Sequence, residues 1–308
     1  MYKKKRNRTP SFSSVNSPLI RKSMQKVGLI FLLPTCAAFC VGFLYPFFKG
    51  LYLSFCNFTT TSDGKWVGLS NYVQAVQDPS FVHAFWYTAL FAAVTLILIN
   101  VFAFLVAYAL TRGIKGANLF RTVFFMPNLI GGIVLGYIWS MIFGTLLPAL
   151  FHTTLALSTQ CGFWGLVILI CWQQIGYMMI IYIAGIQNIP TDIEESARMD
   201  GANGWQMLRH ITIPSVMPSI TICTFLTLTN SFKLFDQNLA LNGGQPFIFK
   251  DGTTIRTTEM LALNIYNTFY GSANSRGVGQ AKAVLFFLLV GAIGLLQLRS
   301  TKSKEVQR

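Results

Sequence analysis

Six runs of apolar residues constrain what this chain of 308 residues can fold into. Each run is close to the length at which a helix crosses the hydrocarbon layer of a membrane, about 20 residues. Backbone polar groups inside lipid must be paired within the segment, so a helix is expected for each run. The sequence therefore predicts an all-α membrane protein with six transmembrane helices. The runs, bounded by charged or turn residues, are 27–48, 85–110, 123–143, 163–187, 216–235 and 278–298.

The composition agrees with a location in the cell membrane. Apolar residues make up 53% of the chain and charged residues only 11%, and the mean hydropathy is +0.52. A net charge of +14 could indicate nucleic acid as a partner. The basic residues, however, gather beside the apolar runs, which is a topology signal, so we expect no nucleic-acid binding. The six cysteines have no metal-ligand spacing and are interpreted as small core residues; no metal site is expected.

The basic residues also predict the orientation. Most of the 24 Lys and Arg residues fall in segments that share one side if the N-terminus is inside. The positive-inside rule then places both termini in the cytoplasm. The basic tail 1–26 is expected to face membrane lipid. The predicted organisation is a tail 1–26, a transmembrane domain 27–298 with a cytoplasmic loop 190–214 and an external connection 236–277, and a tail 299–308.

Local signals add detail to this plan. Prolines 34, 46 and 127 lie within or close to apolar runs and predict kinked helices. In the external connection, the sequence PFIFKDGTTIRT has two β-prone runs around an Asp-Gly turn and predicts a hairpin. The sequence TEMLALNIYNTFY, which follows it, predicts a short helix.

The loop 190–214 does not resemble a membrane segment, although apolar runs flank it on both sides. Pro190 ends the fourth run, and the four residues from Thr191 to Glu194 have the form of a capping box. Ile193 and Ala197 then share one helix face. Asp200-Gly201 breaks this helix, and a second helix that carries Trp205 and Leu208 on one face is expected to end near His210.

Two interpretations of this helix–turn–helix are open. It could be an amphipathic segment that rests on lipid, or it could contact another protein. A helix on the anionic cytoplasmic leaflet should be rich in lysine. This one instead begins with acidic residues, which favours a protein partner; they are Asp192, Glu194, Glu195 and Asp200.

The pattern Glu195-Ser196-Ala197-x-x-Asp200-Gly201-Ala202, followed by Ile-Thr-Ile-Pro, resembles the EAA loop of membrane subunits of binding-protein-dependent ABC importers. In detail it is similar to the carbohydrate branch, the first permease of maltose and multiple-sugar systems. Ser196 replaces the usual alanine, a change between small residues. The resemblance covers nearly the whole chain through Leu-Leu-Pro at 32–34, SFCNF at 54–58, GLSNY at 68–72, RTVFFMPNLI at 121–130 and NGGQP at 242–246.

The resemblance implies a type I importer permease fold and a coupling helix that docks into a cytoplasmic ATPase subunit. The expected coupling residues are Glu194, Glu195, Ser196, Ala197, Asp200, Gly201 and Ala202. The expected partners are a second sugar permease, two ABC ATPase subunits and an extracellular solute-binding protein. No G-x-x-x-x-G-K-[ST] phosphate-binding motif occurs in the sequence, so ATP and Mg²⁺ are expected on the ATPases, with no cofactor in this chain.

The substrate site is predicted from polar residues in the apolar runs, which are costly in lipid unless they face a cavity or the bundle interior. The family's sugar contacts match Gln173, Gln174 and Tyr177 in the fourth run and Asn230 and Lys233 in the fifth, with Asp236 close by. Amides donate to and accept from hydroxyl groups, and a ring can cover a sugar face. Lys233 and Asp236 could alternatively neutralise each other.

We therefore expect a non-enzymatic subunit of an ATP-driven importer of sugar, with an oligosaccharide favoured as the substrate. One alternative is an ion-coupled secondary transporter, which would need membrane-embedded carboxylates. A second is an ABC permease for another solute such as glycerol phosphate, against which the lack of arginine in the apolar runs counts. An intramembrane enzyme is not favoured, because the three histidines fall in loops or at the edges of the runs.

Overall fold

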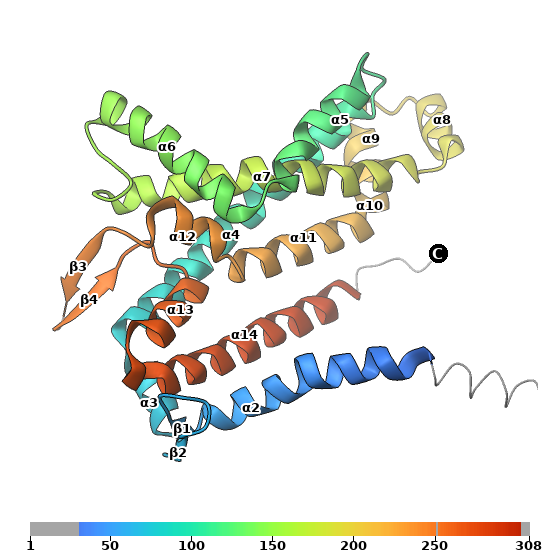
Figure 1. Cartoon of the computed structure of the whole chain (residues 1–308). Helices are drawn as coiled ribbons and strands as arrows, with labels where there is room; N and C mark the ends of the chain where they lie inside the picture. Colours follow the sequence, from blue (N-terminus) through green and yellow to red (C-terminus); the bar gives the residue numbers. More distant parts are fainter. Residues whose placement is uncertain (1–30, 251, 303–308) are drawn as a thin grey trace, which may run out of the picture. The chain divides into compact units, whose positions relative to one another are not determined.

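The computed structural model describes residues 31–250 and 252–302 (Figure 1). The predicted tail 1–26 and the start of the first apolar run lie outside these residues. The chain divides into two units, the first ending at Leu53 and the second beginning at Ser54. Each unit is described by itself.

The first unit contributes one apolar helix, Phe31–Leu53, whose most apolar stretch contains no buried residue. It contains a π-turn, η2 (Cys40–Leu44), and continues as α2 (Tyr45–Leu53). The wide turn ends two residues before Pro46, which cannot donate a backbone hydrogen bond, so an irregularity is present near this proline. The helix runs past the predicted end of the first run at residue 48, because Lys49 does not stop it. A long lysine side chain can carry its charge away from an apolar stem.

The second unit is built around two long helices, α4 (Pro79–Leu110) and α7 (Thr159–Gln187) (Figure 1). They confirm the predicted runs 85–110 and 163–187. Asp78 caps α4 by accepting a hydrogen bond from the Ser80 amide at 2.9 Å. The two helices form a shared apolar core with full burial of Phe91, Ile99, Ala103, Ala107, Leu169, Met178 and Met179.

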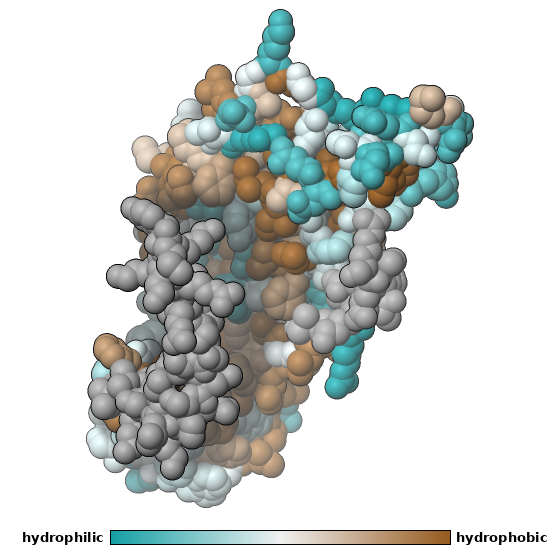
Figure 2. Space-filling view, turned by 90° about the vertical axis from the view of Figure 1, so that its right-hand side faces the viewer, coloured by the Kyte–Doolittle hydropathy of each residue, from teal (hydrophilic) through white to brown (hydrophobic). Residues whose placement is uncertain are grey.

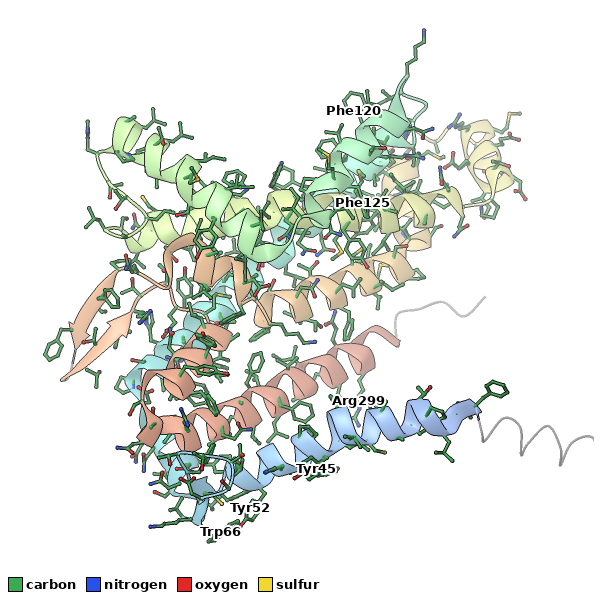
Figure 3. The ribbon with its side chains drawn as sticks, in the orientation of Figure 1. Tyr45, Tyr52, Trp66, Phe120, Phe125 and Arg299 are labelled. Atoms are coloured by element: carbon green, nitrogen blue, oxygen red, sulfur yellow. The ribbon has the colours of Figure 1, made fainter. Side chains whose placement is uncertain are left out.

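The third predicted run, 123–143, is interrupted near Pro127, as that proline predicted, but the bounds of the run are wrong. The structure has α5 (Ala117–Phe125), a 3₁₀ turn η3 (Met126–Leu129) and α6 (Gly132–Phe151). Pro127 opens the 3₁₀ turn, and Ile130 and Gly131 are extended. Helix α5, which carries Phe120 and Phe125 in Figure 3, packs on α7, whereas α6 follows a different direction after the break (Figure 1).

The fifth run also differs from its prediction. A helical path formed by α9 (Gly204–Met207), the π-turn η4 (Leu208–Thr212) and α10 (Ile213–Ser215) leads into α11 (Met217–Phe232) at a bend of 67°. The helix expected to end near His210 therefore continues to Ser215. Prolines at 214 and 218 accompany the bend, and each removes a backbone donor there.

Helix α12 (Asp236–Asn242) begins soon after α11 and packs against α6 (Figure 1). The predicted hairpin is confirmed, with β3 (Phe247–Lys250) antiparallel to β4 (Thr253–Arg256). The predicted helix after it is α13 (Leu261–Gly271). The other short elements are β1 (Cys56–Asn57), which pairs with β2 (Lys65–Trp66), α3 (Ser70–Gln77), and η5 (Ala273–Ser275).

The last helix, α14 (Arg276–Lys302), contains the sixth predicted run, 278–298. This run contains a charged residue, Lys282, and the structure explains its position. Its side chain is fully buried and its Nζ donates to Asp78 Oδ2 at 2.6 Å and to Asn264 Oδ1 at 3.0 Å. A buried charge needs such partners, so the lysine ties α14 to the start of α4 and to α13.

Among the described residues, five helices are long and apolar enough to cross a membrane, and there are six if the bent pair of α9–α10 with α11 is counted as one span. This agrees with the six predicted spans.

Packing of α5 on α7 depends on Gly176. A Cβ atom built there would lie 1.8 Å from the Phe124 carbonyl oxygen, a backbone atom that cannot move aside alone. Overpacking typically costs about 1–3 kcal/mol, and we expect Gly176→Ala to lower the free energy of unfolding by at least this amount. A Cβ at Gly144 in α6 meets nothing within 4 Å, so Gly144→Ala is the control. Thermal unfolding in detergent measures both, and equal melting temperatures would contradict this packing.

Candidate functional sites

The first candidate site is the elbow formed by α8 (Thr191–Met199) and α9. The predicted capping box at Thr191 is wrong: Pro190 precedes the helix and no side chain caps it. Glu194 instead pairs with Arg198 at 3.5 Å, one turn later. Pro190 occupies the N-cap position and has no side-chain acceptor, so the first amides of α8 have no side-chain cap.

A true capping box lies at the start of α9. Asn203 Oδ1 accepts from the Gln206 amide at 2.9 Å, and Gln206 Oε1 accepts from the Asn203 amide at 2.8 Å. These two bonds satisfy backbone donors that a helix start leaves free. The capping box therefore stabilises the start of α9 in the elbow, and its two residues, Asn203 and Gln206, were not among the expected site residues.

Gly201 makes the turn between the two helices, as predicted. Its φ is +80°, which places it in the left-handed region that glycine enters without strain. The Gly201 amide donates to the Arg198 carbonyl at 3.1 Å, and the Ala202 amide donates to the Ala197 carbonyl at 3.0 Å. This pair of bonds is the Schellman arrangement that ends a helix, so it fixes the angle between α8 and α9.

The outer surface of the elbow is open and mostly polar. Ile193 and Ala197 are half-buried on one face, while Glu195 and Ser196 are exposed. Met199 is 88% exposed at the tip. Figure 2 shows hydrophilic residues gathered over the end of the molecule that carries α8 and α9. Among the described residues Glu195 has no ion pair, so its carboxylate is available to another protein.

Behind the elbow, Met207 is the residue that anchors it, with 6% of its surface exposed. A cavity of about 590 Å³ separates the elbow from the ends of α4 and α7. Its lining includes Tyr108, Arg112, Glu194, Arg198 and Met207. The elbow is therefore held at few points and projects from the helices behind it.

The second candidate site is a cavity of about 330 Å³ between α4, α7, α11 and α12. It brings together four of the six predicted substrate residues. They are Gln174, Asn230, Lys233 and Asp236. Gln173 lies next to the cavity, buried to 5% exposure. Tyr177 packs against the apolar core and is not among the lining residues.

The charges and amides of this cavity leave hydrogen-bonding capacity free. Gln174 Oε1 is buried and has no partner in the described part of the chain. Lys233 and Asp236 are both exposed and form no ion pair with each other. The alternative that these two residues neutralise each other is therefore not supported. A buried carbonyl oxygen without a donor is costly, which makes it a natural acceptor for a ligand hydroxyl.

Three further polar side chains line the cavity, Thr227, Ser231 and Gln237, of which Thr227 and Gln237 were missed from the sequence. Thr227 accepts from Asn100 Nδ2 at 3.4 Å, and the Ser231 hydroxyl lies 3.0 Å from that of Thr95 on α4. Small hydroxyl residues in apolar runs are common and give little signal. Gln237 falls in the predicted external connection, and only its position next to Asp236 could have indicated it.

The fold and the sequence identify the class of protein. Residues 111–300 match the family model of binding-protein-dependent transport system inner membrane components. The chain belongs to this family and is a multi-pass membrane protein.

Individual relatives are similar over nearly their full length. The probable starch degradation products transport system permease protein of Thermoanaerobacterium thermosulfurigenes is 41% identical and covers 90% of this chain and 94% of its own. The multiple sugar-binding transport system permease protein of Streptococcus mutans is 31% identical, with 93% and 99% covered. A bacterial ABC transporter for alginate import has the same fold, with a TM-score of 0.74 at 20% identity, covering 92% and 99%.

The elbow angle can be tested at Gly201. Any other residue at a φ of +80° is strained by roughly 1–2 kcal/mol. We expect Gly201→Ala to loosen the elbow and to speed tryptic cleavage at the exposed Arg198 and Arg209 severalfold. Gly204→Ala is the matched control, because its φ is ordinary and a Cβ there meets nothing within 4 Å. Equal cleavage rates in the two variants would contradict the strain argument.

Proposed function

We propose that this chain is a membrane-spanning subunit of an ATP-driven importer of sugar, with an oligosaccharide as the substrate. The observation that carries the proposal is a cavity lined by amides, hydroxyls and single charges in a chain 41% identical to a permease named for starch degradation products. The second relative is named for multiple sugars, which supports the same substrate class.

The chemistry of the cavity suits a sugar. Amide groups both donate and accept, so Gln174 and Asn230 can each satisfy hydroxyl groups of a sugar ring. Lys233 can donate to ring or hydroxyl oxygens and Asp236 can accept from hydroxyls. Each hydroxyl left without a partner in a dry site costs about 1–3 kcal/mol. Such a lining would therefore select sugars by the positions of their hydroxyl groups.

The energy would come from partner subunits. In this proposal the elbow docks as a coupling helix on one of two ABC ATPase subunits, which bind the nucleotide and Mg²⁺, and this chain has no enzymatic activity. Glu195 and Ser196 are exposed there, and Gly201 sets the angle. A second, related permease would complete the pathway, and an extracellular solute-binding protein would deliver the sugar.

The elbow and the cavity are linked through one helical path. It runs from α9 through η4 and α10 into α11, and α11 carries Thr227, Asn230 and Ser231 to the cavity. Movement of the elbow when the ATPases close would therefore shift one wall of the cavity directly. This supports rigid-body switching between an inward-facing and an outward-facing state. An ion-coupled transporter would need no such elbow.

Docking can be tested at Glu195. We expect Glu195→Lys to abolish co-purification of the ATPase and sugar uptake, because it reverses the charge of an exposed contact. Glu195→Gln should retain part of both, since it keeps the shape and loses only the charge. Gln74→Lys on the exposed face of α3 is the control. Uptake that persists in the Glu195→Lys variant would contradict a role in coupling and favour the ion-coupled alternative.

The cavity can be tested at Gln174. We expect Gln174→Ala to lower uptake and to change the ratio of rates between glucose, maltose and maltotriose by about tenfold or less, the value of one hydrogen bond. Gln160→Ala, at the exposed start of the same helix, is the control. Membrane content of each variant is measured by immunoblot. An unchanged ratio would remove Gln174 from the site.

A further inference from the structure

Helix α12 is seated on α6 by two glycines one turn apart. A Cβ at Gly132 would lie 2.8 Å from Asp236 Cβ and 2.9 Å from the amide of Gln237. A Cβ at Gly136 would lie 2.6 Å from Ala240 Cβ. The G-x-x-x-G spacing lets two helices approach closely in a membrane. The contact therefore fixes the first turn of α12, with Asp236 and Gln237, at the wall of the cavity.

From this position Gln237 begins a short chain of amide hydrogen bonds. Its Nε2 donates to Gln173 Oε1 at 2.8 Å, and Gln173 Nε2 donates to the Ile130 carbonyl at 3.3 Å. Ile130 lies in the break between η3 and α6, where the backbone is extended. A carbonyl in such a break needs a partner from another element. The chain thus ties α12, α7 and the break before α6 together.

Gln237 also faces the cavity itself. It lines the cavity together with Gln174, the neighbour of Gln173 on α7. A primary amide nitrogen carries two hydrogens, and Gln173 uses one of them. The second hydrogen and the carbonyl oxygen of Gln237 can reach a ligand in the cavity. The same side chain therefore belongs to the ligand site and to the bond chain.

We propose that Gln237 is a positioning and specificity-determining residue. It orients Gln173, and through Gln173 it makes the geometry of the break between η3 and α6 depend on which ligand occupies the cavity. This inference rests on the proposed function, because it takes the occupant to be a sugar. A hydroxyl that bonds the Gln237 amide draws it away from Gln173, so that the hydrogen bond between the two side chains is lost. The Ile130 carbonyl then loses its ordered donor, and α6 is free to change its direction relative to α5.

The test uses the complete transporter, reconstituted in lipid vesicles with its ATPases and solute-binding protein. Uptake of radiolabelled glucose, maltose and maltotriose gives KM and kcat for Gln237→Leu, Gln173→Leu and the double variant. The change from glutamine to leucine keeps the approximate volume and removes the amide. Gln160→Leu at the exposed start of α7 is the matched control.

We expect each single variant to raise KM about three- to tenfold for the preferred sugar and to change the ratio between sugars. The double variant should be no worse than the more severe single one, because both remove one chain. Gln173→Glu is the second route: its carboxylate still accepts from Gln237 but cannot donate to Ile130, so it should change kcat more than KM. It replaces Gln173→Leu if that variant fails to assemble.

Three outcomes would overturn the inference. In the first, the effects of the two single variants multiply in the double variant. In the second, both single variants have wild-type KM values. In the third, kcat and the amount of assembled protein fall equally while KM is unchanged. Failure of the proposed function is distinguishable, since it would appear as wild-type transporter that moves none of the sugars, or as uptake that is indifferent to Glu195→Lys.

Discussion

Pairing of the backbone inside lipid is the constraint on which the rest of this structure depends. An unbroken helix satisfies it alone, as α4 and α7 do, but every break exposes carbonyl groups that something else must bond. At Ile130 the partner is the Gln173 side chain, at 3.3 Å. The polar residue Gln173 of α7 therefore satisfies a backbone group of a neighbouring segment, and the cavity lies next to such residues.

Close packing of helices makes these bonds possible. The hydrophobic effect does not hold apolar helices together in lipid, so small residues that let backbones approach become decisive. Gly176 admits the end of α5, and a Cβ at Gly185 would lie 2.2 Å from Ser219 Oγ, so that glycine admits the start of α11. Both lie on α7. This helix is consequently the axis against which the broken helices are positioned.

The sequence predicted the structure correctly where local residues alone determine the conformation of an element. Uninterrupted apolar runs predicted α4 and α7, and the Asp-Gly turn predicted the pairing of β3 with β4. The prediction was wrong where contacts between several elements determine the conformation. Pro127 indicated a kink within the third span, but the change of direction at Gly131 depends on contacts of α5 with α7 and of α6 with α12. Thr191 matched a capping box in type, yet Pro190 occupies the N-cap position.

The candidate sites show the same division. The elbow could be predicted because glycine at 201, a local requirement, marks its turn. Three residues of the cavity were predicted from polar positions in the fourth and fifth runs, and a fourth, Asp236, from its place directly after the fifth run. Gln237 could not be predicted, because its segment appears external until α12 is seen to pack on α6. The consequence is physical. A helix that is too short and too polar to cross the membrane completes the cavity, and two glycines on α6 are what place it there.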